Sequence, residues 1–189
     1  MGSGIKKELF FVSRAQEEAG IQKMIYNIKR KYPDWVDDQT LMLMVSPDFS
    51  GIVTTIMAQA LSTPGKPLMY VDCVHVPDPD EQVHLFQNRF QHDWPSIQRS
   101  FEEKPMEKFI LVEAGVISGR NYQWITDMMI NTFGVPKENI LTVALYESTR
   151  SVFKCDIVGE RYDSFLQDLC FWWEIPNVAF GDYSEEMSV

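Results

Sequence analysis

Residues Phe109 to Gln123 read FILVEAGVISGRNYQ, and this segment indicates the class of fold. It opens with an apolar run typical of a buried strand, reaches Glu113, and continues into a short segment with two glycines. A helical pattern of apolar residues follows. We therefore expect a strand over 108–113, a loop over 113–121 and a helix over 121–134.

The 113–121 loop carries residue types that suit an anion. Free N–H groups and the dipole at a helix N-terminus favour negative charge, and donor side chains or an arginine add to this. The residues concerned are Ser118, Gly119, Arg120 and Asn121. Glu113 can accept hydrogen bonds from a pair of hydroxyls. The residues alone predict a phosphate site with a diol nearby, and they leave open an ordinary turn in which Ser118 or Asn121 caps the helix.

Apolar runs alternate with helical patterns along the rest of the chain. We expect helices over 15–31 (capped by Ser13) and 52–62, strands over 40–45, 67–74 and 138–147, and strand-like structure within 156–174. This order predicts an α/β fold of three layers, with a mainly parallel β-sheet flanked by helices. Ligands of such sheets lie beyond the carboxyl ends of the strands, which points to the loops 46–51 and 113–121.

Composition limits the partners of the chain. Its 189 residues suit a single domain over 1–189, and 45% of them are hydrophobic. The formal net charge is −10 and the pI is about 4.7, which disfavours a nucleic acid polymer or an anionic membrane as partner. No apolar run approaches the roughly 20 residues of a membrane helix.

The spacing of cysteines and histidines disfavours a zinc site, and the cysteine content is typical of a protein from a reducing compartment. The three cysteines lack close spacing, and so do the three histidines. They are Cys73, Cys155 and Cys170, and His75, His84 and His92. We expect reduced, buried thiols, a cytoplasmic location and no zinc site.

Two segments differ from the rest. Residues 75–107 are polar with scattered aromatics and prolines, and we expect a variable, mobile segment there. Residues 181–189 form an acidic tail that we expect to be loose.

The segment ILVEAGVISGRN, residues 110–121, resembles the signature of the type I phosphoribosyltransferases. That signature is an apolar strand, two adjacent acids, two linking residues and a Thr-Thr-Gly-Arg-Thr-like loop that enters a helix. Glu113 matches the first acid and Ala114 replaces the second. Ser118 to Arg120 match the loop, and Asn121 stands where threonine is usual.

The resemblance extends over about residues 10–180. KPLMYVDC (66–73) matches the next strand of the family, and CDIVGERYD (155–163) and FWWEIP (171–176) look like its closing stretches. The pattern is most similar to xanthine/hypoxanthine-type purine phosphoribosyltransferases. It implies a small hood region beside the main sheet, and a homodimer.

The resemblance also implies a role for each matching position. Glu113 would bind the ribose hydroxyls and, through them, Mg²⁺. The 5′-phosphate would be held by Ile117, Ser118, Gly119, Arg120 and Asn121. The pyrophosphate would meet Ser46, Asp48, Ser50 and Gly51. Phe171 or Trp172 would stack on the nucleobase and Glu174 would recognise its edge, although aromatic residues in such a run also serve as core. The implied ligands are phosphoribosyl pyrophosphate or a nucleoside monophosphate, a nucleobase and Mg²⁺.

Three departures from the family pattern bear on catalysis. Ala114 removes a charge near an oxocarbenium-like transition state, and losing one such electrostatic partner costs about 2.7–4 kcal/mol. Ile117 stands where purine enzymes place an acid, and it cannot exchange a proton with the base. Asp48 would repel pyrophosphate unless Mg²⁺ lay between them. Cations that could close over the site are Arg89, Arg99, Lys104 and Lys108.

Three functions stay open. The first is a nucleobase phosphoribosyltransferase that transfers phosphoribosyl to a purine-like base. The second is a catalytically inactive protein of the same fold that binds nucleotide or has a regulatory or interaction role. The third is an unrelated nucleotide-binding α/β domain, although the motifs GxxxxGK[ST], GxGxxG and GxSxG are absent. Nucleotide binding without turnover would distinguish the second from the first.

Overall fold

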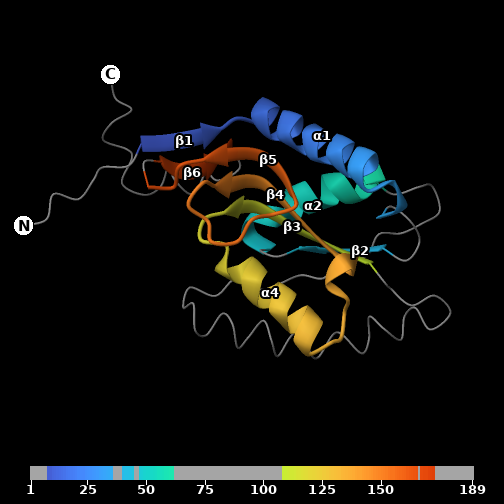
Figure 1. The fold of residues 1–189 in the computed structure, drawn as a ribbon. Helices are drawn as coiled ribbons and strands as arrows, with labels where there is room; N and C mark the ends of the chain where they lie inside the picture. The colour runs from blue at the N-terminus through green and yellow to red at the C-terminus, as the bar shows by residue number, and fades with distance from the viewer. Residues whose placement is uncertain (1–7, 36–39, 45–46, 62–107, 166, 173–189) are drawn as a thin grey trace, which may run out of the picture.

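A computed structural model describes residues 8–35, 40–44, 47–61, 108–165 and 167–172, and Figure 1 shows its fold. The α-helices are α1 (Arg14–Lys31), α2 (Pro47–Leu61) and α4 (Arg120–Asn131). The strands are β1 (Glu8–Val12), β2 (Thr40–Met44), β3 (Lys108–Val116), β4 (Ile140–Ser148), β5 (Ile157–Tyr162) and β6 (Gln167–Phe171). Short 3-10 helices cover Pro33–Trp35 and Lys137–Asn139.

The main sheet has the strand order β2-β3-β4-β5, and all its neighbours are parallel. β3 and β4 are the central strands, and every residue of β4 is buried. Strands covered on both faces read as continuous apolar runs, which is why the sequence predicted these two so clearly. Glu113 lies opposite Ala144 in the register, and Val116 lies opposite Glu147.

Helices cover both faces of this sheet, as Figure 1 shows. α1 and α2 pack on one face, where Ile110, Val112 and Ala114 join their core. α4 packs on the other face, where Phe109 and Leu111 contribute. The predicted α/β fold of three layers with a mainly parallel sheet is therefore confirmed.

α1 begins where the sequence indicated. Ser13 caps it, and its Oγ accepts a hydrogen bond from the Gln16 backbone N–H. The Gln16 side chain accepts one from the Ser13 backbone N–H across 2.9 Å. Two of the otherwise unpaired donors at the start of the helix are thus satisfied.

A second sheet consists of β1 and β6, and β1 was not predicted from the sequence. β1 pairs with β6 in parallel, and Glu8 lies opposite Gln167 in the register. Leu9 and Phe11 of β1 are partly exposed, whereas Val12 is buried. The strand-like structure expected within 156–174 is present as β5 and β6, but β1 went unrecognised because its partner is so distant in sequence.

Two expected boundaries are wrong. The predicted loop 46–51 is helical from Pro47 onward, because proline suits the first position of a helix and an acid next to it suits the helix dipole. The strand predicted to end at Glu113 continues to Val116, since Gly115 and Val116 still pair with β4. The carboxylate therefore lies within the strand.

Several expectations fall outside the described residues. These are the strand 67–74, the variable segment 75–107, the tail 181–189, and the site residues Ser46 and Glu174. Within the described ranges, no helix has the length and apolar character needed to cross a membrane.

Candidate functional site

The turn between β3 and α4, residues 117–119, leaves the carboxyl edge of the main sheet. Gly119 is the N-cap of α4 and has φ +77°, a left-handed conformation that favours glycine. Gly119 has no side chain to cap α4, but Ser118 Oγ accepts the Arg120 backbone N–H across 3.4 Å, so Ser118 uses one of the donors at the start of the helix. Ile117, Ser118, Arg120 and Asn121 are all exposed here. The start of α4 therefore presents its remaining backbone donors together with an exposed arginine.

Gly119 is also required for space. A Cβ at this position would lie 2.4 Å from Ser151 Oγ and 2.6 Å from Phe153 Cβ. Both neighbours belong to the crossover loop, residues 149–156, which connects β4 to β5. The β3–α4 turn is thus packed closely against this loop.

The crossover loop supports the turn through polar and aromatic contacts. Val152 donates its backbone N–H to the Ser118 carbonyl across 3.1 Å. The Phe153 ring stacks on Tyr122 in α4 with centroids 5.4 Å apart. The Ser151 hydroxyl donates to the Phe153 carbonyl across 2.7 Å, which fixes the loop internally.

Tyr122 anchors the start of α4 to the sheet. Its hydroxyl lies 2.6 Å from the Val143 carbonyl and 3.1 Å from the Leu111 carbonyl, so it reaches both central strands. Burial is the main reason that the pKa of Tyr122 lies well above its usual value, and the neighbouring ionisable groups of Cys155 and Glu113 raise it further. The hydroxyl stays protonated and remains a donor.

Glu113 lies on the face of the sheet that α4 covers. It alternates with Phe109 and Leu111 along β3, and its side chain is 5% exposed. Its charge contributes to the raised pKa of Tyr122. The carboxylate implied to bind a ribose is therefore largely enclosed between the sheet and α4, next to the β3–α4 turn.

Ala114 faces the other way. It is fully buried in the core that α1 and α2 form with the sheet. The acid that the family pattern places at this position is thus replaced by apolar packing.

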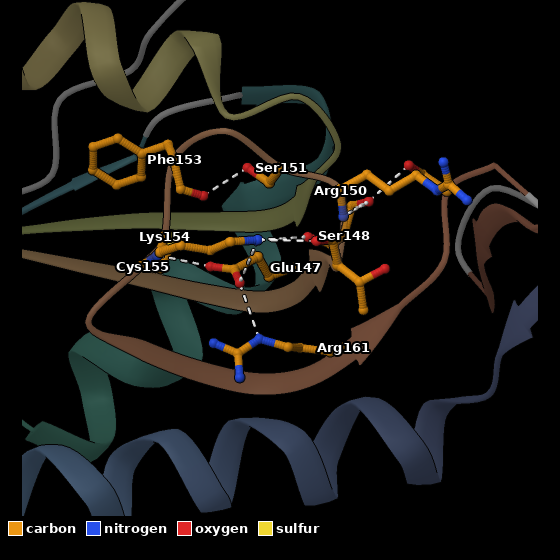
Figure 2. A network of polar contacts seen from close by, with 10 residues as sticks. Glu147, Ser148, Arg150, Ser151, Phe153, Lys154, Cys155 and Arg161 are labelled. Carbon is orange, nitrogen blue, oxygen red and sulfur yellow. Dashed lines mark hydrogen bonds and ion pairs between the residues drawn. The ribbon is translucent and has the colours of Figure 1, made fainter.

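A second buried acid lies at the end of β4, and Figure 2 shows the contacts around it. Glu147 is 0% exposed, and its Oε2 accepts the Cys155 backbone N–H across 2.7 Å. Its Oε1 accepts from Arg161 Nε across 3.0 Å and lies 3.9 Å from Lys154 Nζ. Burial is the main reason that the pKa of the Cys155 thiol is raised, and the charge of Glu147 raises it further. Sequence reasoning missed Glu147, although an acid inside the apolar run of β4 was a visible signal.

The implied pyrophosphate residues fall on α2. Asp48, Ser50 and Gly51 belong to the first turns of this helix, which follows the carboxyl end of β2. Because β2 and β3 are parallel, α2 begins at the same edge of the sheet as the β3–α4 turn. Lys108, in contrast, begins β3 at the opposite edge and donates to the Asp34 carbonyl, so it does not reach this site.

The implied base-stacking residues have unequal settings. Phe171 is buried in the core, where its ring packs edge-on against Tyr146 with the ring centroids 5.9 Å apart. Trp172 is half-buried, donates its indole N–H to the Glu17 carboxylate, and has the Arg14 guanidinium 5.7 Å from its ring centroid. Glu17 was missed, although it shares the apolar face of α1 with Ile21 at helical spacing.

The described residues do not assemble a metal site by themselves. No three His, Cys, Asp or Glu side chains among them are placed to hold an ion. Mg²⁺ often takes only one or two protein carboxylates and fills its shell with substrate phosphates and water. Glu113 would be the protein carboxylate in such a shell, and Ala114 supplies no second one.

A cavity of about 640 Å³ lies beside α4. Its walls include Ile140 and Thr142 at the start of β4, which is the amino edge of the sheet. Gln123 in the first turn of α4 and Phe153 and Lys154 in the crossover loop also line it, so the cavity extends to the residues that support the β3–α4 turn.

Comparison with known proteins identifies the fold. No protein-family model matches the sequence, and no curated protein matches it. Among solved structures, Helicobacter pylori xanthine-guanine-hypoxanthine phosphoribosyltransferase is similar, with a TM-score of 0.62, 8% identity, and coverage of 93% of this chain and 98% of that chain.

Two further structures agree. Purine phosphoribosyltransferase from Pyrococcus horikoshii has a TM-score of 0.55 at 10% identity, covering 88% of this chain and 94% of that chain. The Leishmania tarentolae HGPRT-ase, solved in complex with GMP, has a TM-score of 0.54 at 17% identity, covering 87% of this chain and 85% of that chain. The chain therefore has the fold of the purine phosphoribosyltransferases, as the resemblance of residues 110–121 implied.

Proposed function

We propose that this chain binds phosphoribosyl pyrophosphate or a purine nucleoside monophosphate at the β3–α4 turn, and transfers phosphoribosyl to a purine-like base. The observation that carries the proposal is the start of α4, where Gly119 is left-handed and Arg120 is exposed. Similarity of fold to purine phosphoribosyltransferases, one of them solved with GMP, supports the choice of ligand.

The residues of the turn would act mainly by binding and orientation. Backbone N–H groups at the start of α4 would donate to the phosphate oxygens, and Ser118, Arg120 and Asn121 would add side-chain donors. Glu113 would accept from the ribose hydroxyls. A base nitrogen would then form a bond to ribose C1 while the bond from C1 to pyrophosphate breaks, pyrophosphate leaves with the electron pair, and the proton on that nitrogen passes to solvent. Positioning of the two reactants supplies the rate gain.

Binding without turnover is the second candidate, and Ala114 favours it. An acid at this position would have to enter the apolar core that α1 and α2 cover, because Ala114 is fully buried there. Ile117 moreover offers no acceptor for the proton that the base loses. The binding part of the proposal does not depend on an acid at position 114 or on a proton acceptor at position 117.

Calorimetric titration tests the binding part. Phosphoribosyl pyrophosphate, GMP and IMP would each be titrated into the protein, with and without Mg²⁺. We expect saturable binding that Arg120→Ala weakens about tenfold, the effect of losing one charge-assisted contact. Arg30→Ala, an exposed arginine near the end of α1, is the matched control and should bind as the parent does.

Turnover is then measured separately. Xanthine, guanine and hypoxanthine would be incubated with phosphoribosyl pyrophosphate and Mg²⁺, and release of pyrophosphate recorded. Release with any of these bases identifies a transferase. Binding of GMP with no release for all three identifies the inactive binding protein, and no binding by folded protein contradicts both.

A further inference from the structure

Glu147 is a charged group in a place where charge is costly. Its side chain is 0% exposed at the end of a strand buried on both faces. Burying a carboxylate is costly unless it is paired and hydrogen-bonded. Glu147 Oε2 accepts a hydrogen bond from the Cys155 backbone N–H, and Oε1 accepts one from Arg161 Nε. Lys154 Nζ lies 3.9 Å from Oε1. These partners come from the crossover loop and from β5.

Lys154 connects the carboxylate to the first residues of the crossover loop. Its Nζ donates to the Thr149 carbonyl across 3.2 Å, while it also faces Glu147. The Cys155 N–H belongs to the far end of the same loop. Figure 2 shows Lys154 and Arg161 on either side of the Glu147 carboxylate. One buried group therefore holds both ends of the loop.

The middle of that loop is what the β3–α4 turn rests on. Ser151 and Phe153 occupy the space that a Cβ on Gly119 would need. The Val152 backbone N–H donates a hydrogen bond to the Ser118 carbonyl, and the Phe153 ring stacks on Tyr122 in the first turn of α4. The position of the loop thus sets the orientation of the donors at the start of α4.

We propose that Glu147 is a positioning residue for the anion site: by fixing both ends of the crossover loop, it holds the β3–α4 turn in the shape that receives a phosphate. Glu147 does not touch the ligand. The two cations it holds are each about half exposed, at 52% and 56%, so they cover the carboxylate while their outer surfaces face solvent. The inference rests on the proposed function, since it names what supports the same site.

The test compares GMP with guanosine, which differ only in the phosphate. Glu147→Ala should weaken GMP binding about tenfold, because binding must then order a turn that the crossover loop no longer holds in place, while guanosine affinity stays unchanged. Glu147→Gln should lie between, because an amide oxygen still accepts the Cys155 N–H but no longer attracts Arg161 and Lys154. Glu160→Ala, which removes an exposed acid one residue before Arg161 in β5, is the matched control.

A second readout needs no ligand. Amide hydrogen exchange of Val152 reports its bond to Ser118, and the amide chemical shift of Gly119 reports the turn. Both should change in Glu147→Ala and Glu147→Gln and stay at parent values in Glu160→Ala. If Glu147→Ala does not fold, Glu147→Gln carries both measurements alone.

The outcomes separate the two proposals. Selective loss of GMP affinity together with faster Val152 exchange supports the positioning role. An equal loss of affinity for GMP and guanosine overturns the positioning role, because it indicates a general defect in the protein. Unchanged GMP affinity in the Glu147 variants overturns it as well. If the parent protein binds neither ligand, the proposed function fails, and unchanged Val152 and Gly119 amides in the Glu147 variants would then overturn the structural link as well.

Discussion

The Tyr122 hydroxyl lies 2.6 Å from the Val143 carbonyl, and this contact fixes the start of α4 to the central strand β4. The same hydroxyl reaches the Leu111 carbonyl of β3. The helix whose N-terminus forms the candidate anion site is therefore attached to both strands that end beside it.

Tyr122→Phe should lower the free energy of unfolding by about 1–2 kcal/mol, because it leaves buried carbonyl oxygens without this donor. Chemical denaturation of the two proteins measures the difference. Tyr26→Phe is the control, since Tyr26 is 61% exposed and should change stability little. Equal stability of parent and Tyr122→Phe would contradict the anchoring role.

Gly119→Ala should be far more damaging than Gly134→Ala. Both glycines have positive φ, +77° and +68°, so alanine is strained at either position by about 1 kcal/mol. A Cβ on Gly119 also collides with Ser151 and Phe153, whereas one on Gly134 meets nothing within 4 Å. Thermal unfolding should show a much larger loss for Gly119→Ala, with GMP binding lost only there. Similar losses would show that space at Gly119 does not matter.

Glu17→Gln should stabilise the protein near neutral pH. Burial is the main reason that the pKa of Glu17 is raised from its ordinary value of 4.5, so the folded state holds this proton more tightly than the unfolded state. Stability from the protonated acid is present below that ordinary value and is lost as pH rises through the folded pKa. Glutamine stays neutral and its amide oxygen can still accept the Trp172 N–H. The gain in Tm should shrink as pH falls toward 4.5, and a gain independent of pH would contradict this explanation.

Cys155 should resist alkylation in the native protein. Burial raises the pKa of its thiol, and the thiolate is the reactive form. Iodoacetamide at pH 8, followed by mass spectrometry of peptides, should label Cys155 only after denaturation. Rapid labelling of the folded chain would show that the crossover loop opens readily.

The main sheet was predictable because its central strands are continuous apolar runs. β3 and β4 are buried on both faces, and nothing local competes with the strand they imply. The end of β3 was placed three residues early because an acid usually marks the surface. Glu113 is enclosed by α4 instead, which no local pattern reveals.

The contacts of the two other buried acids could not be predicted from the sequence either, because they too depend on distant parts of the chain. Glu17 and Glu147 are buried acids, and each is paired with residues supplied by another part of the fold, Trp172 and Arg161. Burial of a charge is unusual enough that sequence reasoning places such residues on the surface. β1 was missed because its pairing with β6 joins opposite ends of the described chain.

The most direct test of the central claim is calorimetric titration of GMP into the parent protein, Gly119→Ala, Arg120→Ala and Arg30→Ala. We expect saturable binding by the parent and by Arg30→Ala, with about tenfold weaker binding for Arg120→Ala and none for Gly119→Ala. Binding that is unaffected by changes at positions 119 and 120, or no binding by a folded parent protein, would contradict a phosphate site at the β3–α4 turn.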